Sequence, residues 1–199
     1  MDIIDNLVLV GYRGVGKSAV ARHLARLTGW ELCSLDEMLK KRFSQGLQEF
    51  IQANGWPAFR AAETELLKEL QGRKGAVIDC GGGIIETPEN LPLLKSLGTV
   101  VWLTASETQI RNRILSSRSM RLSLTGGCSA ADPEEIHAVL QRRNPLYHQV
   151  ADVTIDSTGM ESYDAAQLIC PPRSRRYPPH QNLPAPADET GGDADDTSA

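Results

Sequence analysis

The chain has 199 residues, a formal net charge of −4 at neutral pH and 41% hydrophobic residues, which suits one domain with a proper core. The near balance of charges argues against a nucleic-acid-binding surface, and no apolar run approaches the length of a membrane span. The four cysteines are widely spaced, with no Cys-x-x-Cys pair, and no signal peptide is visible at the N-terminus, so we expect reduced thiols, no zinc site and a cytoplasmic location.

Short apolar runs alternate with segments of helical periodicity along the chain. The expected strands are 7–10, 31–34, 76–79, 99–103 and 153–155. The expected helices are 18–27, 36–43, 47–53, 58–70, 91–97, 106–115, 134–149 and 162–169. Thr87-Pro88 and Asp132-Pro133 have the residue types that begin helices. This alternation predicts an α/β fold of three layers, in which helices cover both faces of a five-stranded parallel sheet.

A complete phosphate-binding loop follows the first expected strand and opens the first expected helix. Residues 11–18 read GYRGVGKS. Glycines let the backbone N–H groups and the positive end of a helix surround phosphate oxygens. The lysine should reach the β- and γ-phosphates of a nucleotide, and the serine hydroxyl should bind Mg²⁺. The predicted nucleotide-binding residues here are Gly11, Gly14, Val15, Gly16, Lys17, Ser18 and Ala19.

Two further segments interrupt the simple strand–helix alternation. About forty residues separate the second and third expected strands, more than a crossover needs, and they include Arg60 and Glu63, which are spaced to pair on a helix. The third strand ends in Asp79 and is soon followed by Gly81, Gly82 and Gly83, where backbone can approach a ligand closely. Both segments should lie at the carboxyl edge of the sheet, where ligands of such folds bind.

Two segments lack a helical or strand pattern. Residues 116–131 form a long loop inside the domain, which is typical of a functional lid. Residues 171–199 contain six of the eleven prolines and many charged residues, so they cannot bury enough apolar surface to offset their ordering entropy. We therefore expect one domain over 1–170, with an insert at about 36–63 and a lid at about 116–131, followed by a disordered tail over 171–199.

Taken together, the motifs resemble those of the shikimate kinase family, among the nucleoside-monophosphate-kinase-like P-loop kinases. The resemblance covers about 6–169. It includes the phosphate loop, Asp36, the run Phe59-Arg60-x-x-Glu63, the three glycines, Arg121 in the expected lid, and residues 143–147, which read RNPLY. It implies a monomeric enzyme that transfers the γ-phosphoryl group of ATP, with Mg²⁺, to the 3-hydroxyl of shikimate, giving shikimate 3-phosphate and ADP.

The resemblance also assigns roles to individual residues. Arg60 and Arg143 would bind the carboxylate of shikimate, for which planar guanidinium groups are suited. Asp36 would orient the attacking hydroxyl, and Lys17 and Arg121 would spread the charge of the transferring phosphoryl group. Gly81, Gly82 and Gly83 would offer backbone N–H groups to substrate and phosphate. Arg113 would stack on adenine, although a solvated helix arginine is an equal alternative.

Four residues depart from the family pattern. Ser34 replaces the first acid of the usual acid–x–acid pair, which helps to hold Mg²⁺ through water. Asp79, which stands where the family more often has a small or hydroxyl residue, could restore that charge from the neighbouring strand, or could instead bond to turn amides. Trp56 replaces a glutamate, and Leu122 follows Arg121 in place of proline. Two alternatives therefore remain open: a kinase for another small polyol acid such as gluconate, and a non-catalytic nucleotide-binding module.

Overall fold

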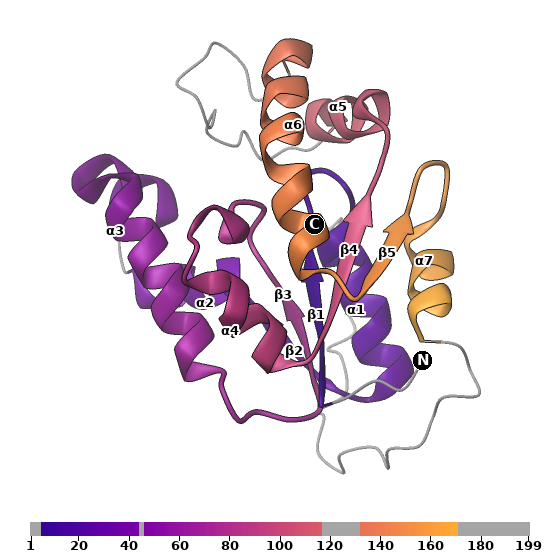
Figure 1. The fold of residues 1–199 in the computed structure, drawn as a ribbon, viewed down its shortest axis with the longest axis horizontal. Coiled ribbons are helices and arrows are strands. Elements are labelled where there is room, and N and C mark those ends of the chain that lie inside the picture. Colours follow the sequence, from indigo (N-terminus) through magenta and orange to yellow (C-terminus); the bar gives the residue numbers. More distant parts are fainter. Residues whose placement is uncertain (1–4, 44–45, 117–131, 171–199) are drawn as a thin grey trace, which may run out of the picture.

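Five parallel strands form one sheet in the computed structural model, which describes residues 5–43, 46–116 and 132–170 (Figure 1). The strands are β1 (Asn6–Val10), β2 (Glu31–Ser34), β3 (Ala76–Asp79), β4 (Thr99–Thr104) and β5 (Val153–Asp156). Their order is β2-β3-β1-β4-β5. The predicted parallel α/β fold is therefore confirmed, and the carboxyl ends of β1, β2 and β3 lie next to one another.

Helices cover both faces of this sheet. They are α1 (Lys17–Thr28), α2 (Leu35–Arg42), α3 (Leu47–Glu69), α4 (Asn90–Leu97), α5 (Glu107–Ser116), α6 (Pro133–Val150) and α7 (Ser162–Ile169), with a short 3₁₀ turn η1 (Ile84–Glu86). The central strand divides its side chains between two buried clusters, because successive residues point to opposite faces. Val8 and Val10 pack with α2, α3 and α4, whereas Leu7 and Leu9 pack with α1 and α7.

The segment between β2 and β3 keeps the predicted break between the expected helices 47–53 and 58–70. Both lie within α3, and the backbone between them is non-helical at Gly55 (φ 79°, ψ 168°), two residues before Pro57. Glycine tolerates this positive φ, and the proline removes a backbone donor at the same point. The kink turns the first half of α3 relative to the half that carries Arg60.

The predicted helix start at Thr87-Pro88 lies two residues before the observed one, whereas the expected helix 91–97 begins within one residue of it. The chain first makes the turn η1, and α4 begins at Asn90. The Asn90 side chain is buried; it donates to the Ile84 carbonyl at 2.8 Å and accepts from the Thr64 hydroxyl at 2.7 Å. These tertiary bonds define the start of α4. The other predicted start is confirmed, because the Asp132 side chain accepts from the Glu134 N–H.

Some predictions fall outside the described residues. They concern the tail at 171–199 and nearly all of the lid at 116–131, including Arg121, Leu122 and Cys128. The other three cysteines, Cys33, Cys80 and Cys170, are buried free thiols. Among the helices that the structure describes, none is long and apolar enough to cross a membrane.

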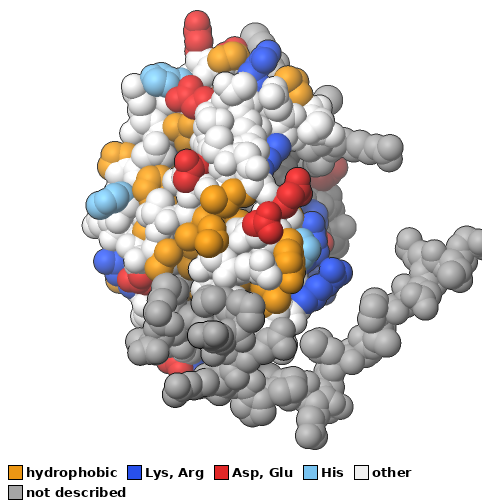
Figure 2. All heavy atoms as spheres, turned by 90° about the vertical axis from the view of Figure 1, so that its right-hand side faces the viewer, with side chains coloured by type: hydrophobic (Ala, Val, Ile, Leu, Met, Phe, Trp, Pro, Cys, Tyr) orange, Lys and Arg blue, Asp and Glu red, His pale blue; other side chains and the backbone are white. Residues whose placement is uncertain are grey.

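Figure 2 shows the face on the right-hand side of Figure 1, where β5 and α7 lie. Apolar side chains are exposed on this face (Figure 2), and the segment that follows β5 contains three exposed large apolar residues, Met160, Tyr163 and Leu168. Acidic, basic and apolar side chains alternate over the described part of this face, which carries no continuous basic patch (Figure 2).

Asn6, at the start of β1, joins three parts of the fold. Its fully buried side chain donates to the carbonyls of Arg73 and Leu97 and accepts from the Ala76 N–H.

Asn6→Ala should lower the free energy of unfolding by about 3 kcal/mol, because buried backbone groups lose their partners. Urea unfolding measures this loss. Asn54→Ala, which removes an exposed side chain that donates to Phe50, should change stability by less than about 0.5 kcal/mol; equal losses in the two variants would contradict the assignment.

Candidate active site

The phosphate loop joins β1 to α1 with the geometry that its sequence predicts. Gly16 caps α1 at φ 102°, a conformation that favours glycine. The ammonium group of Lys17 donates to the carbonyls of Gly11 at 2.8 Å and Tyr12 at 3.1 Å. Ser18, one residue further, is exposed at the start of the helix. The loop therefore presents a lysine, a hydroxyl and a helix N-terminus on one edge of the sheet, which is an arrangement suited to phosphate.

Arg113 lies against this loop rather than in solvent. Its Nη1 atom donates to the Val15 carbonyl at 2.8 Å, and the Ser157 hydroxyl donates to the same carbonyl at 3.1 Å. The guanidinium therefore connects α5 to the phosphate loop. This bond disfavours a fully solvated arginine, although the side chain is only partly buried, and stacking on adenine stays a prediction.

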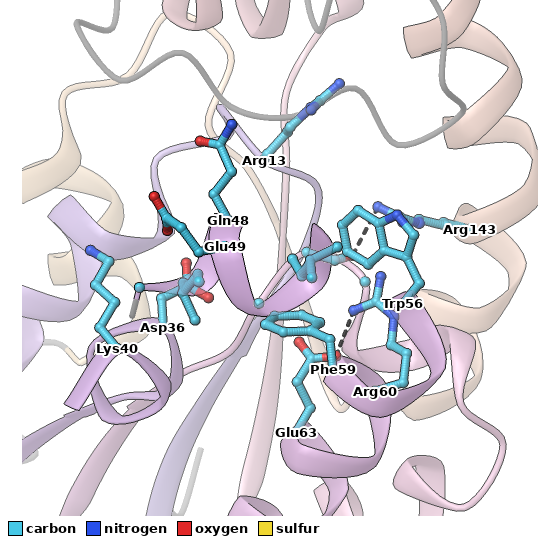
Figure 3. Close-up of a pocket in the computed structure, with 16 residues that line it drawn as sticks. Arg13, Asp36, Lys40, Gln48, Glu49, Trp56, Phe59, Arg60, Glu63 and Arg143 are labelled. Atoms are coloured by element: carbon cyan, nitrogen blue, oxygen red, sulfur yellow. Dashed lines mark hydrogen bonds and ion pairs between the residues drawn. The ribbon is translucent and has the colours of Figure 1, made fainter. Parts of the chain in front are cut away.

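A cavity of about 440 Å³ opens beside the phosphate loop (Figure 3). It brings together all six residues predicted to bind the second substrate, and Glu63, which was predicted to pair with Arg60. They come from α2, α3, α6 and the segment after β3, and they are Asp36, Arg60, Glu63, Gly81, Gly82, Gly83 and Arg143. The cavity is also lined by Arg13, Lys40, Trp56 and Phe59, and by residues from the first half of α3.

Arg60 is held on several sides at the wall of this cavity. Its Nη1 atom lies 2.5 Å from Glu63 Oε2, which confirms the predicted pair. Its Nη2 atom lies 3.3 Å from Glu86 Oε2. The guanidinium carbon also stands 5.3 Å from the centre of the Trp56 ring, within the range of a cation–π interaction. Trp56, which stands where the resemblance leads us to expect a glutamate, therefore contacts the arginine (Figure 3).

The glycines after β3 leave room for charged side chains. A Cβ atom at Gly83 would lie 2.2 Å from Arg60 Nη2, and one at Gly81 would lie 2.8 Å from Glu63 Oε1. At Gly82 a Cβ atom would lie 3.1 Å from the backbone nitrogen of Arg13. The three glycines therefore allow the backbone to pass between the phosphate loop and the Arg60–Glu63 pair.

Arg143 is almost completely buried, with 1% of its surface exposed. It donates to the Gly82 carbonyl at 3.2 Å and to Glu86 Oε2 at 2.6 Å. The Tyr147 hydroxyl donates to the same Gly82 carbonyl. The Nε atom of Arg143 is buried and has no hydrogen-bond partner among the described residues. Other atoms of this side chain line the cavity.

Two glutamates with opposite pKa shifts flank the arginines. Burial raises the pKa of Glu63, and the neighbouring Arg60 opposes that shift. Partial burial alone would also raise the pKa of Glu86, but hydrogen bonds from Arg143 and Arg142 hold it below its ordinary value. Glu86 is therefore a carboxylate at neutral pH. It is a site residue that the sequence analysis missed.

Ser34 and Asp79 lie side by side at the carboxyl ends of β2 and β3, where the register pairs them directly. Asp79 is 7% exposed. Burial raises the pKa of the adjacent Cys80 thiol well above its ordinary value; Asp79 raises it further, and Lys17 lowers it. The Asp79 carboxylate and the Lys17 ammonium are thus both close to this thiol.

The oxygen donors at this edge fit Mg²⁺ as a partner of a nucleotide. Within residues 5–43, 46–116 and 132–170, no three His, Cys, Asp or Glu side chains form a cluster that could hold a metal ion. Mg²⁺ needs no such cluster when phosphates supply part of its coordination, because one or two protein oxygens then suffice. Ser18 and Asp79 are the residues whose oxygens would serve here.

The comparisons with known proteins agree with this geometry. The family model described as "Shikimate kinase" matches residues 13–170. A shikimate kinase of Syntrophus aciditrophicus (strain SB) is 37% identical over 172 residues, covering 82% of this chain and 88% of its own. For shikimate kinase 2 of Sodalis glossinidius (strain morsitans), the identity is 38% over 157 residues, with 77% and 87% coverage.

A solved structure shares the fold as well. It is the shikimate kinase from Acinetobacter baumannii in complex with shikimate, which superimposes with a TM-score of 0.75 at 31% sequence identity. The superposition covers 84% of this chain and 92% of that one. The chain belongs to the shikimate kinase family.

Proposed function

We propose that the cavity beside the phosphate loop is the shikimate site, and that different residues around it bind the substrate, orient its hydroxyl and hold the phosphates. The reaction is that of the family, the transfer of the γ-phosphoryl group of ATP to the 3-hydroxyl of shikimate, which gives shikimate 3-phosphate and ADP. The observation that carries the assignment is the placement of Asp36 across the cavity from Arg60 and Arg143 (Figure 3). A small ring with a carboxylate at one end and hydroxyls at the other matches that separation of charges.

Arg60 and Arg143 bind the carboxylate end of the substrate. Their positions are defined before substrate arrives, because each is held by carboxylates or a carbonyl. Such preorganisation lowers the entropic cost of binding. Asp36, in the first turn of α2, accepts a hydrogen bond from the attacking hydroxyl and orients it towards the phosphate loop.

Lys17 and the loop backbone hold the β- and γ-phosphates. Ser18 and Asp79 would hold Mg²⁺, which would neutralise charge on the phosphate oxygens when bound. Arg121 is assigned to the transferring phosphoryl group from the sequence alone, since it lies outside the described residues. Arg113 binds near adenine. A monomeric state and a cytoplasmic location complete the proposal.

Release of ADP tests the acceptor directly. The purified chain, supplied with ATP and Mg²⁺, should release ADP in a coupled assay when shikimate is added and not when gluconate is added. Turnover with gluconate instead would favour a polyol-acid kinase, and nucleotide binding without turnover of either acid would favour a non-catalytic module.

Gly83→Ala should selectively weaken shikimate binding. The backbone tolerates alanine, since Gly83 has φ −103°, but the new Cβ atom would collide with the Arg60 guanidinium. Displacing that group should raise KM for shikimate on the order of tenfold or more, while KM for ATP stays the same. Steady-state kinetics with each substrate varied in turn measure both constants.

Gly72→Ala is the control for Gly83→Ala. The new Cβ atom would meet no other atom within 4 Å, although φ is +77°. The change should lower stability without affecting either KM. An unchanged KM for shikimate in Gly83→Ala would contradict the proposed position of Arg60.

Asp79→Asn tests whether Asp79 supplies the charge that Ser34 lacks. The variant should need several-fold more Mg²⁺ for half-maximal activity, and calorimetry should show weaker Mg²⁺-dependent binding of ATP. Adding Ser34→Asp to the variant should restore both, because the two positions are direct neighbours on β2 and β3. If Asp79→Asn lowers only the melting temperature, Asp79 is a structural residue bonded to turn amides.

A further inference from the structure

Glu86 forms ion pairs with three arginines from two helices. Its Oε1 atom lies 2.6 Å from Arg142 Nη2. Its Oε2 atom lies 2.6 Å from Arg143 Nη2 and 3.3 Å from Arg60 Nη2. Arg60 belongs to α3 and the other two arginines belong to α6. One carboxylate in the turn η1 thereby connects the substrate-binding insert to α6.

Glu86 contacts these arginines from outside the cavity. Arg60 and Arg143 both line the cavity, and Glu86 does not. The two arginines share one oxygen atom of Glu86, so their guanidinium groups are held at a defined separation and angle. Each has a second anchor: Arg60 donates to Glu63, and Arg143 donates to the Gly82 carbonyl. Loss of Glu86 would leave each arginine with one of its two fixed anchors.

The charges around Glu86 also set what the cavity can bind. Three guanidinium groups and the carboxylates of Glu63 and Glu86 leave one unit of positive charge. A ligand with a single carboxylate brings this group to neutrality. Without Glu86 the group would carry two positive charges and would attract divalent anions more strongly.

We propose that Glu86 is a positioning residue that holds Arg60 and Arg143 as one receptor for a monocarboxylate substrate and keeps small divalent anions from competing for it. The inference rests on the proposed function, in which these two arginines bind the shikimate carboxylate. Glu86 itself does not touch the substrate and acts through the arginines.

Glu86→Gln removes the charge and keeps the size of the side chain. KM for shikimate should rise about tenfold, since charge-assisted hydrogen bonds are lost, while kcat and KM for ATP change by less than about twofold, as expected when ground-state binding is weakened. Sulfate should become a stronger competitive inhibitor against shikimate in the variant than in the wild type. A purely structural role of Glu86 would not produce that change in anion inhibition.

Glu89→Gln is the matched control. It removes the same charge three residues further along, where Glu89 is exposed and pairs with Lys68 at 3.0 Å, and it should leave all these constants unchanged. An unchanged KM for shikimate in Glu86→Gln, or unchanged inhibition by sulfate, overturns the inference. If Glu86→Gln does not fold, Glu86→Asp serves in its place for the KM criterion alone, because it withdraws the carboxylate from the arginines by one methylene group and keeps its charge; an unchanged KM for shikimate then overturns the inference.

The two proposals fail in different ways. If the wild type does not phosphorylate shikimate, the proposed function is wrong. If it does, and calorimetry finds that the wild type and Glu86→Gln bind shikimate equally tightly, only the role of Glu86 is wrong.

Discussion

A buried guanidinium group that must stay charged governs the arrangement of this site. Arg143 is 1% exposed, and an isolated charge at such a position would be prohibitively costly. A carboxylate from η1 and a carbonyl from the glycine segment accept hydrogen bonds from this group, and the Tyr12 ring lies 5.9 Å from the guanidinium carbon. The backbone after β3 must therefore run close to α6. That path in turn brings Gly81 and Gly83 against Glu63 and Arg60.

The parallel sheet supplies the other half of the site. Because β1, β2 and β3 all end at one edge, the phosphate loop, the start of α2 and the glycine segment meet there without long connections. Lys17, Asp36 and Asp79 come from three different strand ends. Cys80 is the buried residue adjacent to them. Its burial raises the pKa of its thiol, and the nearby carboxylates of Asp79, Glu63 and Asp36 raise that pKa further.

Features with a local signature were predictable from the sequence. All five strands, the phosphate loop and the Arg60–Glu63 pair follow from short-range patterns, and the pair is only three residues apart. Glu86 has no such signature, since its partners Arg60 and Arg143 are 26 and 57 residues away. The sequence contains one hint of this cluster. Glu86 is an acidic residue three positions after Gly83, and the consecutive residues Arg142 and Arg143 could pair with it.

One further difference also has a tertiary cause. The start of α4 depends on buried bonds between Asn90, Ile84 and Thr64, which outweigh the local preference of Thr87-Pro88. The contact of Trp56 with Arg60 is local by contrast, because the two residues stand four apart on the part of α3 that follows the kink at Gly55. Periodicity reports which face of a helix is buried, and it does not report which distant group that face meets.

The short segment from Asp79 to Glu86 links both ends of the site. Asp79 stands beside Ser34, the three glycines pass between the phosphate loop and Arg60, and Glu86 reaches α6. Residues that share partners in this way have coupled rather than additive energetics. Evolutionary change at position 86 is consequently constrained by residues 60, 142 and 143 at once, so these four positions should vary together among relatives.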